Sequence, residues 1–275
     1  MRAEADGISE GEFTRFQALM QRVAGIHLPT SKKSLVSGRL SKRLRARGLG
    51  NFGDYYRHIV GGSDPAELQT AIELLTTNET YFFREPGHFE FLAREVLPEA
   101  RPGAAFRVWS AASSTGEEAY SIAMVLMDRL GTSAQWEVFG SDINSRVLDL
   151  ARTATYPTAR NEECIPPDYR RRFCLRGTGG MAGKLRVDAA VRERVRFAQI
   201  NLNGDLKGAG EFDVIFLRNV MIYFDLDMKR RVAAALHRQL RPGGWLFIGH
   251  SESLNGVSGQ FQPVRPAIYR KELAA

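Results

Sequence analysis

The feature that most constrains the fold is a change of pattern after about Pro102. From there to the C-terminus, apolar runs of strand length alternate with segments of helical periodicity. A chain that alternates in this way forms a parallel sheet with helices on both faces. The predicted strands are 107–112, 137–143, 195–202, 212–217 and 245–249, and the predicted helices between them are 116–130 and 227–240. The pattern therefore predicts an α/β domain.

The stretch between the second and third predicted strands, residues 144–194, is too long for one crossover helix. Its start, 144–152, has the pattern of a helix. Its end contains the glycine-rich run RGTGGMAG (176–183) between short runs that could be strands, which is typical of a turn between antiparallel strands. We therefore expect a small antiparallel β subdomain inserted at about 169–194.

The chain before this domain has the pattern of short helices with polar turns. Ser9 and Glu12 have the spacing of a capping box, and apolar residues then recur at helical intervals. Further helices are predicted over 31–47, 51–60 and 65–75. We expect an all-α N-terminal domain and linker over 1–85, and the α/β domain over 86–275.

The helix predicted over 31–47 is basic along its length. Between Thr30 and Gly50 the chain has no acidic residue. The basic residues there are Lys32, Lys33, Arg39, Lys42, Arg43, Arg45 and Arg47. Because the whole chain has a net charge of +7, the remainder is close to neutral. Such a patch indicates an acidic partner surface (nucleic acid, anionic lipid or acidic protein), and a solvated helix face is the alternative.

The composition excludes several classes of protein. No apolar run approaches the roughly 18 residues that span a bilayer, and the N-terminal run MRAEADGISEGEF lacks the apolar core of a signal peptide. We therefore expect a cytoplasmic protein with no direct membrane insertion. Cys164 and Cys174 do not form a CxxC pair and the five histidines are scattered, so neither a disulfide nor a metal site is expected.

The predicted strand ends have the chemistry of a nucleoside site. In an open parallel sheet, ligands bind at the carboxyl ends of the strands where the strand order reverses. The loop AASSTGEE (111–118) is built of small residues, and Asp142 at the end of the second strand suits ribose hydroxyls. Because this loop has one glycine, it does not match the close approach that a pyrophosphate needs. A cofactor with a ribose and no phosphate, such as S-adenosylmethionine, fits better; an ordinary strand-to-helix turn is the alternative.

The fourth strand ends in RNVMIYF (218–224), which provides a cation, an amide and a phenol. Enzymes that methylate amines commonly present Asn-Pro-Pro-Tyr or a relative at this position, and that sequence is absent. The residues present suit a carboxylate oxygen as the methyl acceptor.

Five motifs in order resemble the CheR-type chemotaxis receptor methyltransferases, over nearly the whole chain. They are NETYFFR (78–84), VWSAASSTGEEAYSIAM (108–124), FGSDI (139–143), FDVIFLRNVMIYF (212–224) and LRPGGWLFIGHSES (240–253). One departure is Ala119, where the family often has proline. The resemblance implies a Rossmann-like S-adenosylmethionine-dependent methyltransferase domain with a small β insert, preceded by an all-α domain.

The resemblance also implies roles for particular residues. Arg84 and Tyr223 would face the reactive methyl group and the incoming glutamate. The cofactor would be bound by Asn78, Thr80, Arg84, Glu118, Asp142, Asn201, Leu202, Arg218 and Asn219. Partner contacts would come from Arg39, Lys42, Arg43, Arg45 and Arg47, with Arg176, Gly177 and Gly179 of the insert, which in some members binds a receptor's C-terminal pentapeptide.

The function implied is methyl esterification of chemoreceptor glutamates for chemotactic adaptation, with S-adenosylhomocysteine as product. The partners would be the receptor's methylation helices, so the protein would be recruited to membrane receptor arrays, and we expect a monomer without a nucleic-acid partner. Three alternatives are a nucleic-acid methyltransferase, which the basic helix favours, an adaptor that has lost its chemistry, and a nicotinamide-dependent enzyme, which the single loop glycine disfavours.

Overall fold

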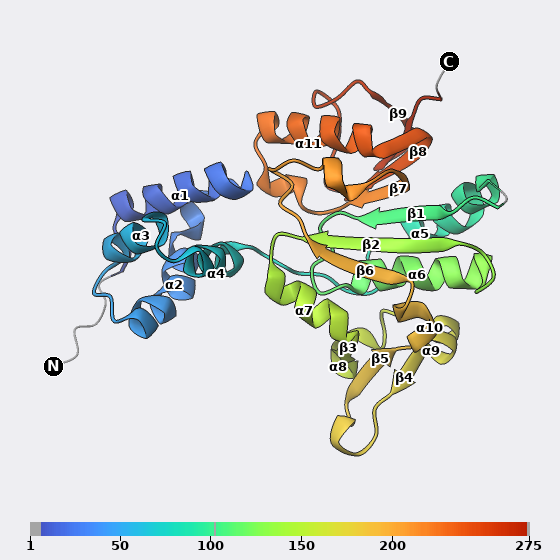
Figure 1. The fold of residues 1–275 in the computed structure, drawn as a ribbon, viewed down its shortest axis with the longest axis horizontal. Coiled ribbons are helices and arrows are strands. Elements are labelled where there is room, and N and C mark those ends of the chain that lie inside the picture. Colours follow the sequence, from blue (N-terminus) through green and yellow to red (C-terminus); the bar gives the residue numbers. More distant parts are fainter. Residues whose placement is uncertain (1–6, 102, 274–275) are drawn as a thin grey trace. The chain divides into compact units, whose positions relative to one another are not determined.

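A computed structural model describes residues 7–101 and 103–273 (Figure 1). Residues 1–6, 102 and 274–275 lie outside the described residues. The first six begin the N-terminal run considered above, and the predicted domain limits at residues 1 and 275 also fall outside the described part. The chain divides into two compact units, one of Met1–Thr77 with Tyr223–Met228 and one of Asn78–Ile222 with Lys229–Ala275. The division at Thr77 falls before the predicted boundary at 85, so the NETYFFR segment belongs to the second unit.

The first unit is helical. It contains α1 Glu10–Ala24, the 3-10 turn η1 Thr30–Lys32, α2 Lys33–Arg47, α3 Phe52–Val60 and α4 Pro65–Leu75. The predicted capping box is present, because the Ser9 hydroxyl accepts from the Glu12 N–H and the Glu12 carboxylate accepts from the Ser9 N–H. Gly48 ends α2 in the left-handed conformation, φ 65°, as expected of a C-terminal glycine.

The core of this helical unit is formed by one face of each helix. Phe13, Phe16, Leu40 and Tyr55 are buried there, and Phe16 packs edge-on against Tyr56 with ring centroids 5.5 Å apart. The segment Tyr223–Met228 belongs to this unit as well, and the His27 N–H donates to the Tyr223 carbonyl at 2.8 Å. The helices are therefore held by their apolar stripes, which were readable from the sequence.

The second unit is built on a seven-stranded sheet in the order β6-β2-β1-β7-β8-β10-β9 (Figure 1). The strands are β1 Phe106–Ser110, β2 Trp136–Asp142, β6 Val195–Gln199, β7 Phe212–Leu217, β8 Leu240–Ile248, β9 Phe261–Arg265 and β10 Ile268–Lys271. The first five are parallel to one another, as predicted.

The expectation of a wholly parallel sheet is wrong at one edge. β10 is antiparallel to β8, and β9 is antiparallel to β10. β9 carries Pro263 and is exposed at all but its first residue, so it lacks the apolar run by which the other strands were predicted. Proline cannot donate to a ladder and is tolerated on an edge strand, which is where β9 lies.

Helices pack on this sheet and bury its aromatic residues. α6 Glu117–Leu130 packs on β1 and β2, and α7 Ser145–Thr153 packs on β2 and β6. Phe216 of β7 and Phe247 of β8 stack with centroids 4.5 Å apart. The remaining helical elements are α5 Gly87–Phe91, the π-helical turn Leu92–Val96, the 3-10 turns Leu97–Glu99, Lys207–Ala209 and Met221–Tyr223, and α11 Leu226–Gln239.

The insert between β2 and β6 forms its own sheet, in the order β3-β5-β4 and antiparallel throughout. Its elements are β3 Thr155–Pro157, α8 Thr158–Asn161, α9 Pro167–Phe173, β4 Cys174–Arg176, the 3-10 turn Gly179–Met181, β5 Lys184–Val187 and α10 Ala189–Arg192. β3 precedes the predicted range of 169–194, because three residues are too few to give a strand pattern. Among the described helices, none is long and apolar enough to cross a membrane.

Candidate functional site

The sheet order locates a binding crevice in the α/β unit. β1 lies between β2 and β7, and the chain extends to β6 on one side of β1 and to β8 on the other. Strand order therefore reverses at β1, and ligands of such sheets bind outside the carboxyl ends of the strands at this point. The loops concerned follow β1, β2 and β7, and most of the predicted cofactor residues are on or next to them.

The loop after β1 is tied to β2 and to the NETYFFR segment. The Ser114 N–H donates to Asp142 Oδ2 at 3.0 Å, and the Ser114 hydroxyl donates to the Asn78 carbonyl at 2.8 Å. Gly116 has φ 95° and a Cβ there would lie 2.9 Å from the Ala151 Cβ, so both conformation and space require glycine. Three of the motifs that are separate in the sequence thus meet here.

Asp142 is buried at the end of β2 and accepts a second hydrogen bond, from the Asn144 N–H to Oδ1 at 2.9 Å. Burial raises the pKa of this carboxyl, while backbone N–H donors from Asn144 and Ser114 oppose the rise. Each oxygen has two lone pairs, so these bonds leave acceptor capacity for ribose hydroxyls.

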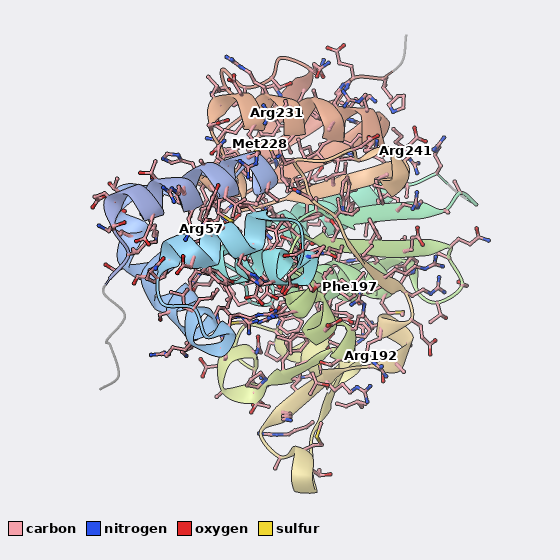
Figure 2. All side chains as sticks on the ribbon, turned by 60° about the vertical axis from the view of Figure 1, so that its left-hand side comes forward. Arg57, Arg192, Phe197, Met228, Arg231 and Arg241 are labelled. Carbon is pink, nitrogen blue, oxygen red and sulfur yellow. The ribbon has the colours of Figure 1, made fainter. Side chains whose placement is uncertain are left out.

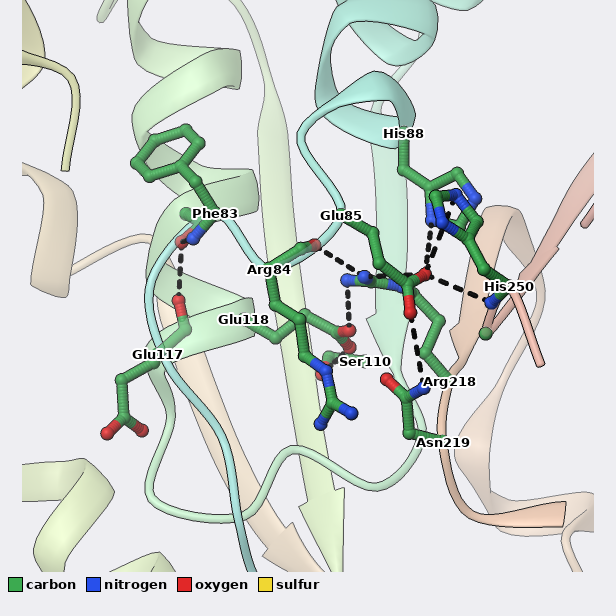
Figure 3. Close-up of polar contacts among 12 residues, drawn as sticks. Phe83, Arg84, Glu85, His88, Ser110, Glu117, Glu118, Arg218, Asn219 and His250 are labelled. Carbon is green, nitrogen blue, oxygen red and sulfur yellow. Dashed lines mark hydrogen bonds and ion pairs between the residues drawn. The ribbon is translucent and has the colours of Figure 1, made fainter. Parts of the chain in front are cut away.

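Arg218, at the end of β7, joins two carboxylates (Figure 3). Its Nη1 donates to Glu118 Oε2 at 2.9 Å, and its Nη2 lies 3.0 Å from Glu85 Oε2. Nη2 also donates to the Arg84 carbonyl. Glu118 accepts from the Ser110 hydroxyl of β1 at 2.7 Å as well. The predicted pair Glu118 and Arg218 is therefore brought together at the switch point.

Glu85 was not predicted, although it directly follows the NETYFFR segment. It accepts from Asn219 Nδ2 at 3.2 Å and from the His250 N–H at 3.2 Å, in addition to Arg218. Burial would raise its pKa, but the Arg218 charge and these donors outweigh burial and lower the pKa. Glu85 has φ 59°, an uncommon conformation for a residue with a side chain. Its position after the motif was the signal available in the sequence.

His88 and His250 lie beside Glu85, and the ligand atoms of the three residues are all within 4.8 Å of one another. The shared Glu85 oxygen already has the Arg218 guanidinium as its partner cation, so a divalent ion here would lie next to a buried positive charge. Burial lowers the pKa of His88 to about 3, with the charge of Arg218 adding to the effect. We therefore assign the group to the ion-pair network.

Glu252, in the GHSES motif, holds the loop after β7 in place. Its carboxylate accepts from the N–H groups of Gly249 at 2.6 Å, Asn219 at 2.9 Å and Ile222 at 3.2 Å. Burial raises the pKa of Glu252, and these backbone donors oppose the rise. Asn219 has φ 58°, and this clamp stabilises that conformation.

Two buried polar atoms at the carboxyl ends of β1 and β7 have no hydrogen-bond partner among the described residues. They are the Ser113 hydroxyl, in the loop after β1, and Arg218 Nε, at the end of β7. Buried polar groups are nearly always paired, so each unpaired group needs an explanation. A polar ligand in the crevice would supply one, and the surrounding set of carboxylates, amides and hydroxyls fits a nucleoside with an amino-acid tail.

The remaining predicted cofactor residues are Thr80, Arg84, Asn201 and Leu202. Thr80 is half-buried in the loop that contains Asn78. Asn201 and Leu202 follow β6, the neighbour of β2, and Asn201 Oδ1 accepts from the Asn203 N–H at 3.0 Å. The Arg84 guanidinium donates to the Glu79 carbonyl at 3.3 Å and lies over the Tyr81 ring, 5.7 Å from its centroid. Tyr223 clusters with the helical unit, so its predicted place beside Arg84 stays a prediction.

The predicted partner residues on α2 separate into two sets. Arg43 and Arg47 donate to the buried Glu67 of α4, through their Nε atoms at 2.8 Å in each case, and Arg39 donates to the carbonyls of Leu74 and Thr76. Lys42 and Arg45 are exposed. The interpretation of all five as a partner surface therefore omitted a structural role for three, because their acceptors are distant in the sequence.

The predicted insert residues form a tight turn after β4. The Gly177 N–H donates to the Lys184 carbonyl at 2.9 Å, and a Cβ on Gly177 would lie 2.0 Å from the Met181 carbonyl oxygen. Gly179 has φ 55°. Arg176 is exposed on β4, which is an edge strand of the small sheet. The two glycines are required by the turn itself.

Comparison with known proteins identifies the class. The family profile described as "CheR methyltransferase, SAM binding domain" matches residues 78–269, and "CheR methyltransferase, all-alpha domain" matches residues 11–76. The fold and the matched domain define an S-adenosylmethionine-dependent methyltransferase. The chain belongs to the CheR methyltransferase family.

Relatives in other bacteria match over nearly their whole length. Chemotaxis protein methyltransferase 2 of Pseudomonas aeruginosa is 44% identical over 263 residues, 94% of this chain and 92% of the relative. Chemotaxis protein methyltransferase of Escherichia coli is 42% identical over 266 residues, 95% of this chain and 91% of the relative. That of Salmonella typhimurium is 40% identical over 264 residues, 95% of this chain and 90% of the relative.

Proposed function

We propose that this methyltransferase esterifies glutamate side-chain carboxylates of chemoreceptors, with the cofactor in the crevice outside β1, β2 and β7. The observation that carries the location is a pair of buried atoms there, the Ser113 hydroxyl and Arg218 Nε, for which the described part of the chain offers no hydrogen-bond partner. The names of the relatives, all chemotaxis protein methyltransferases, support the acceptor class.

Each carboxylate near the crevice has a separate role in this proposal. Asp142 accepts the ribose hydroxyls, because its backbone donors leave acceptor capacity. Glu118 and Arg218 bind the amino-acid tail, whose ammonium and carboxylate suit one residue each. Thr80, Asn201, Leu202 and Asn219 complete the walls, with Asn78 attached to the loop through Ser114.

The bound cofactor supplies an electrophilic methyl group on a sulfonium. In the transfer, a carboxylate oxygen forms a bond to the methyl carbon while the carbon–sulfur bond breaks and sulfur takes the electron pair. A glutamate with an ordinary pKa of about 4.3 is already ionised at neutral pH, so no general base is needed. The protein's contribution is to align the acceptor and exclude water.

Arg84 is the residue best suited to guide the acceptor. Its backbone carbonyl is fixed by Arg218, while its half-buried guanidinium lies on its own loop, over Tyr81. A planar guanidinium matches a carboxylate, but a tight pair would stabilise the ground state, so we infer a positioning role shared with Tyr223. Arg84→Ala should lower kcat about 100-fold while the fold survives; near-normal turnover would remove Arg84 from the mechanism.

The receptor-facing surfaces are proposed from charge and exposure. Lys42 and Arg45 project from α2 without the Glu67 pairing of their neighbours, and they suit an acidic helical surface on the receptor. Arg176, Gly177 and Gly179 lie at the edge strand β4 and its turn, where an extended receptor tail could add a strand. Both contacts would recruit a monomeric, cytoplasmic enzyme to receptor arrays.

The test is transfer of labelled methyl groups to a receptor fragment, with and without its C-terminal tail, followed by release of the label in base, which marks a carboxyl ester. Lys42→Glu with Arg45→Glu should lower receptor methylation about tenfold without changing cofactor affinity. Arg57→Glu, an exposed charge reversal on α3, is the matched control. Base-stable label, or label on RNA, would overturn the acceptor assignment, and a wild-type rate in the variant with Lys42→Glu and Arg45→Glu would overturn the docking surface.

A further inference from the structure

One tyrosine of the insert reaches the loop of the crevice. Tyr156 lies on β3, is 4% exposed, and donates from its hydroxyl to the Thr115 carbonyl at 2.8 Å. Thr115 is in the loop after β1, next to Gly116 and two residues from Ser113. A residue of the small sheet is thus bonded to the backbone of the loop that we assign to the cofactor.

The turn at this point is closely enclosed. A Cβ on Gly116 would lie 3.1 Å from the Tyr156 hydroxyl and 3.2 Å from the Phe197 ring. Phe197 belongs to β6 and is labelled in Figure 2. Because the backbone of the turn packs directly on these side chains, loss of the Tyr156 hydroxyl would release one of its contacts and leave a carbonyl to find another donor.

The same tyrosine also contacts the segment before α5. Its ring meets Phe82 of the NETYFFR motif edge-on, with centroids 4.9 Å apart and an interplanar angle of 84°. Phe82 is buried, and its neighbour Phe83 is fixed by a bond from its N–H to the Ser121 hydroxyl at 2.9 Å. Tyr156 therefore contacts two of the segments that carry proposed cofactor residues, the NETYFFR motif and the loop after β1.

Tyr156 is itself held by the insert. β3 pairs antiparallel with β5, where Tyr156 is opposite Leu185, and the Val187 N–H donates to the Ala154 carbonyl at 3.0 Å. These bonds do not involve the loop after β1. The small sheet therefore holds Tyr156 by bonds that are independent of the loop.

We propose that Tyr156 is a positioning residue for S-adenosylmethionine, and that the insert has a second role in building the cofactor site beside any role in docking a partner. The proposal rests on the cofactor location given above. The hydroxyl acts through the Thr115 carbonyl: it fixes the turn at Gly116 and with it Ser113 and Ser114 of the same loop, whose Ser114 N–H donates to Asp142.

The test is Tyr156→Phe in the full chain, with Tyr169→Phe as the matched control. Tyr169 is also in the insert, and its hydroxyl donates to Asp128 at 3.2 Å, so the control removes a hydroxyl that does not touch the loop. We expect the dissociation constant of S-adenosylhomocysteine, measured by calorimetry, to rise about tenfold in Tyr156→Phe. The KM for S-adenosylmethionine should rise with it and kcat should stay within about twofold, because uniform binding is lost. The control should match wild type.

If Tyr156→Phe also has a lower melting temperature, hydrogen exchange of the peptide containing residues 113–119 distinguishes positioning of the loop from a general loss of stability. Faster exchange confined to this peptide and to the NETYFFR segment supports positioning. Faster exchange throughout the α/β unit would overturn it, since the hydroxyl would then act on the fold. Wild-type affinity in Tyr156→Phe overturns the inference alone, whereas wild-type affinity in Glu118→Gln and Asp142→Asn as well would overturn the cofactor location.

Discussion

Two regions of this protein bury a glutamate against arginine, and they do it in different ways. In the helical unit, Glu67 of α4 is 1% exposed and accepts from Arg43 and Arg47 of α2 and from the Tyr55 hydroxyl of α3 at 2.7 Å. In the α/β unit, Arg218 joins Glu85 and Glu118. The side chains of Glu67 and of Arg218 are each 1% exposed, and an unpaired charge in such a place is costly.

The clusters differ in what supports them and in what they leave open. All partners of Glu67 are on helices, and Arg43 holds the pKa of Glu67 down at about 2. In the Arg218 cluster only Glu118, in the first turn of α6, is on a regular element; Glu85 and Arg218 are on loops, φ is positive at Glu85 and Asn219, and Arg218 Nε remains without a partner among the described residues. A closed cluster on regular elements stabilises a fold, whereas a strained, open one at a switch point is suited to bind a ligand.

Removing the shared cation should have the largest effect. Arg218→Met leaves two nearly buried carboxylates without their partner, so we expect the α/β unit to lose about 3–5 kcal/mol of unfolding free energy and methylation to fall below detection. Tryptophan fluorescence on heating measures the first effect, because Trp109, Trp136 and Trp245 all belong to this unit. Adding Glu118→Gln should recover part of the stability and none of the activity. Recovery of activity would place Arg218 among purely structural residues.

Glu67→Gln should have a smaller effect, confined to the helical unit. Two arginines lose their buried counter-charge while the hydrogen-bonding shape is kept, so we expect a loss of about 2–3 kcal/mol. Hydrogen exchange of peptides from α2, α3 and α4 measures it, because no tryptophan lies in this unit. Cofactor affinity should be unchanged. A weaker affinity for S-adenosylhomocysteine would break the contrast between the two clusters.

Acid should affect the two units in different pH ranges. His88 has a pKa of about 3 in the folded unit, because burial disfavours its charge, against about 6.5 when unfolded. The unfolded chain therefore binds the proton first, and stability falls as the pH drops below 6.5, by about 2 kcal/mol at pH 5. His237, whose pKa burial also lowers, acts in the same direction.

The contribution of Glu67 to the stability of the helical unit is lost only at lower pH. Its folded pKa of about 2 lies below the unfolded value of about 4.3, so its stabilisation is complete above pH 4.3 and is lost as the pH falls toward 2. At pH 5 the melting of the α/β unit should be earlier than at pH 7.5, while α2–α4 exchange, corrected for intrinsic rates, should be unchanged. His88→Phe should reduce the shift. An equal shift in His88→Phe would assign the pH dependence to other groups.

The sequence was most informative where one short pattern determines one element. The capping box at Ser9, the helices of the first unit and the five parallel strands were all predicted, because each depends on local periodicity. The antiparallel edge was missed because β9 contains Pro263 and few apolar residues, and β3 was missed because it has three residues. The order of the five motifs along the chain predicted that the loops after β1, β2 and β7 would lie together.

The partners of individual side chains could not be predicted in the same way. Arg43 and Glu67 are separated by 24 residues, and Tyr156 and Thr115 by 41. Nothing in the local pattern of either segment indicates the other, so the basic helix was interpreted wholly as a surface and the insert wholly as a docking module. Glu85 was overlooked because a carboxylate whose partners are distant in the sequence has no spacing signature.

The central claim is that the cluster at Arg218 builds the cofactor site and the cluster at Glu67 builds the fold. The most direct measurement is calorimetric titration of S-adenosylhomocysteine into two variants that each neutralise one carboxylate, Glu118→Gln and Glu67→Gln. The account predicts at least tenfold weaker binding in Glu118→Gln and wild-type binding in Glu67→Gln. Wild-type binding in Glu118→Gln, or equal losses in both variants, would contradict it.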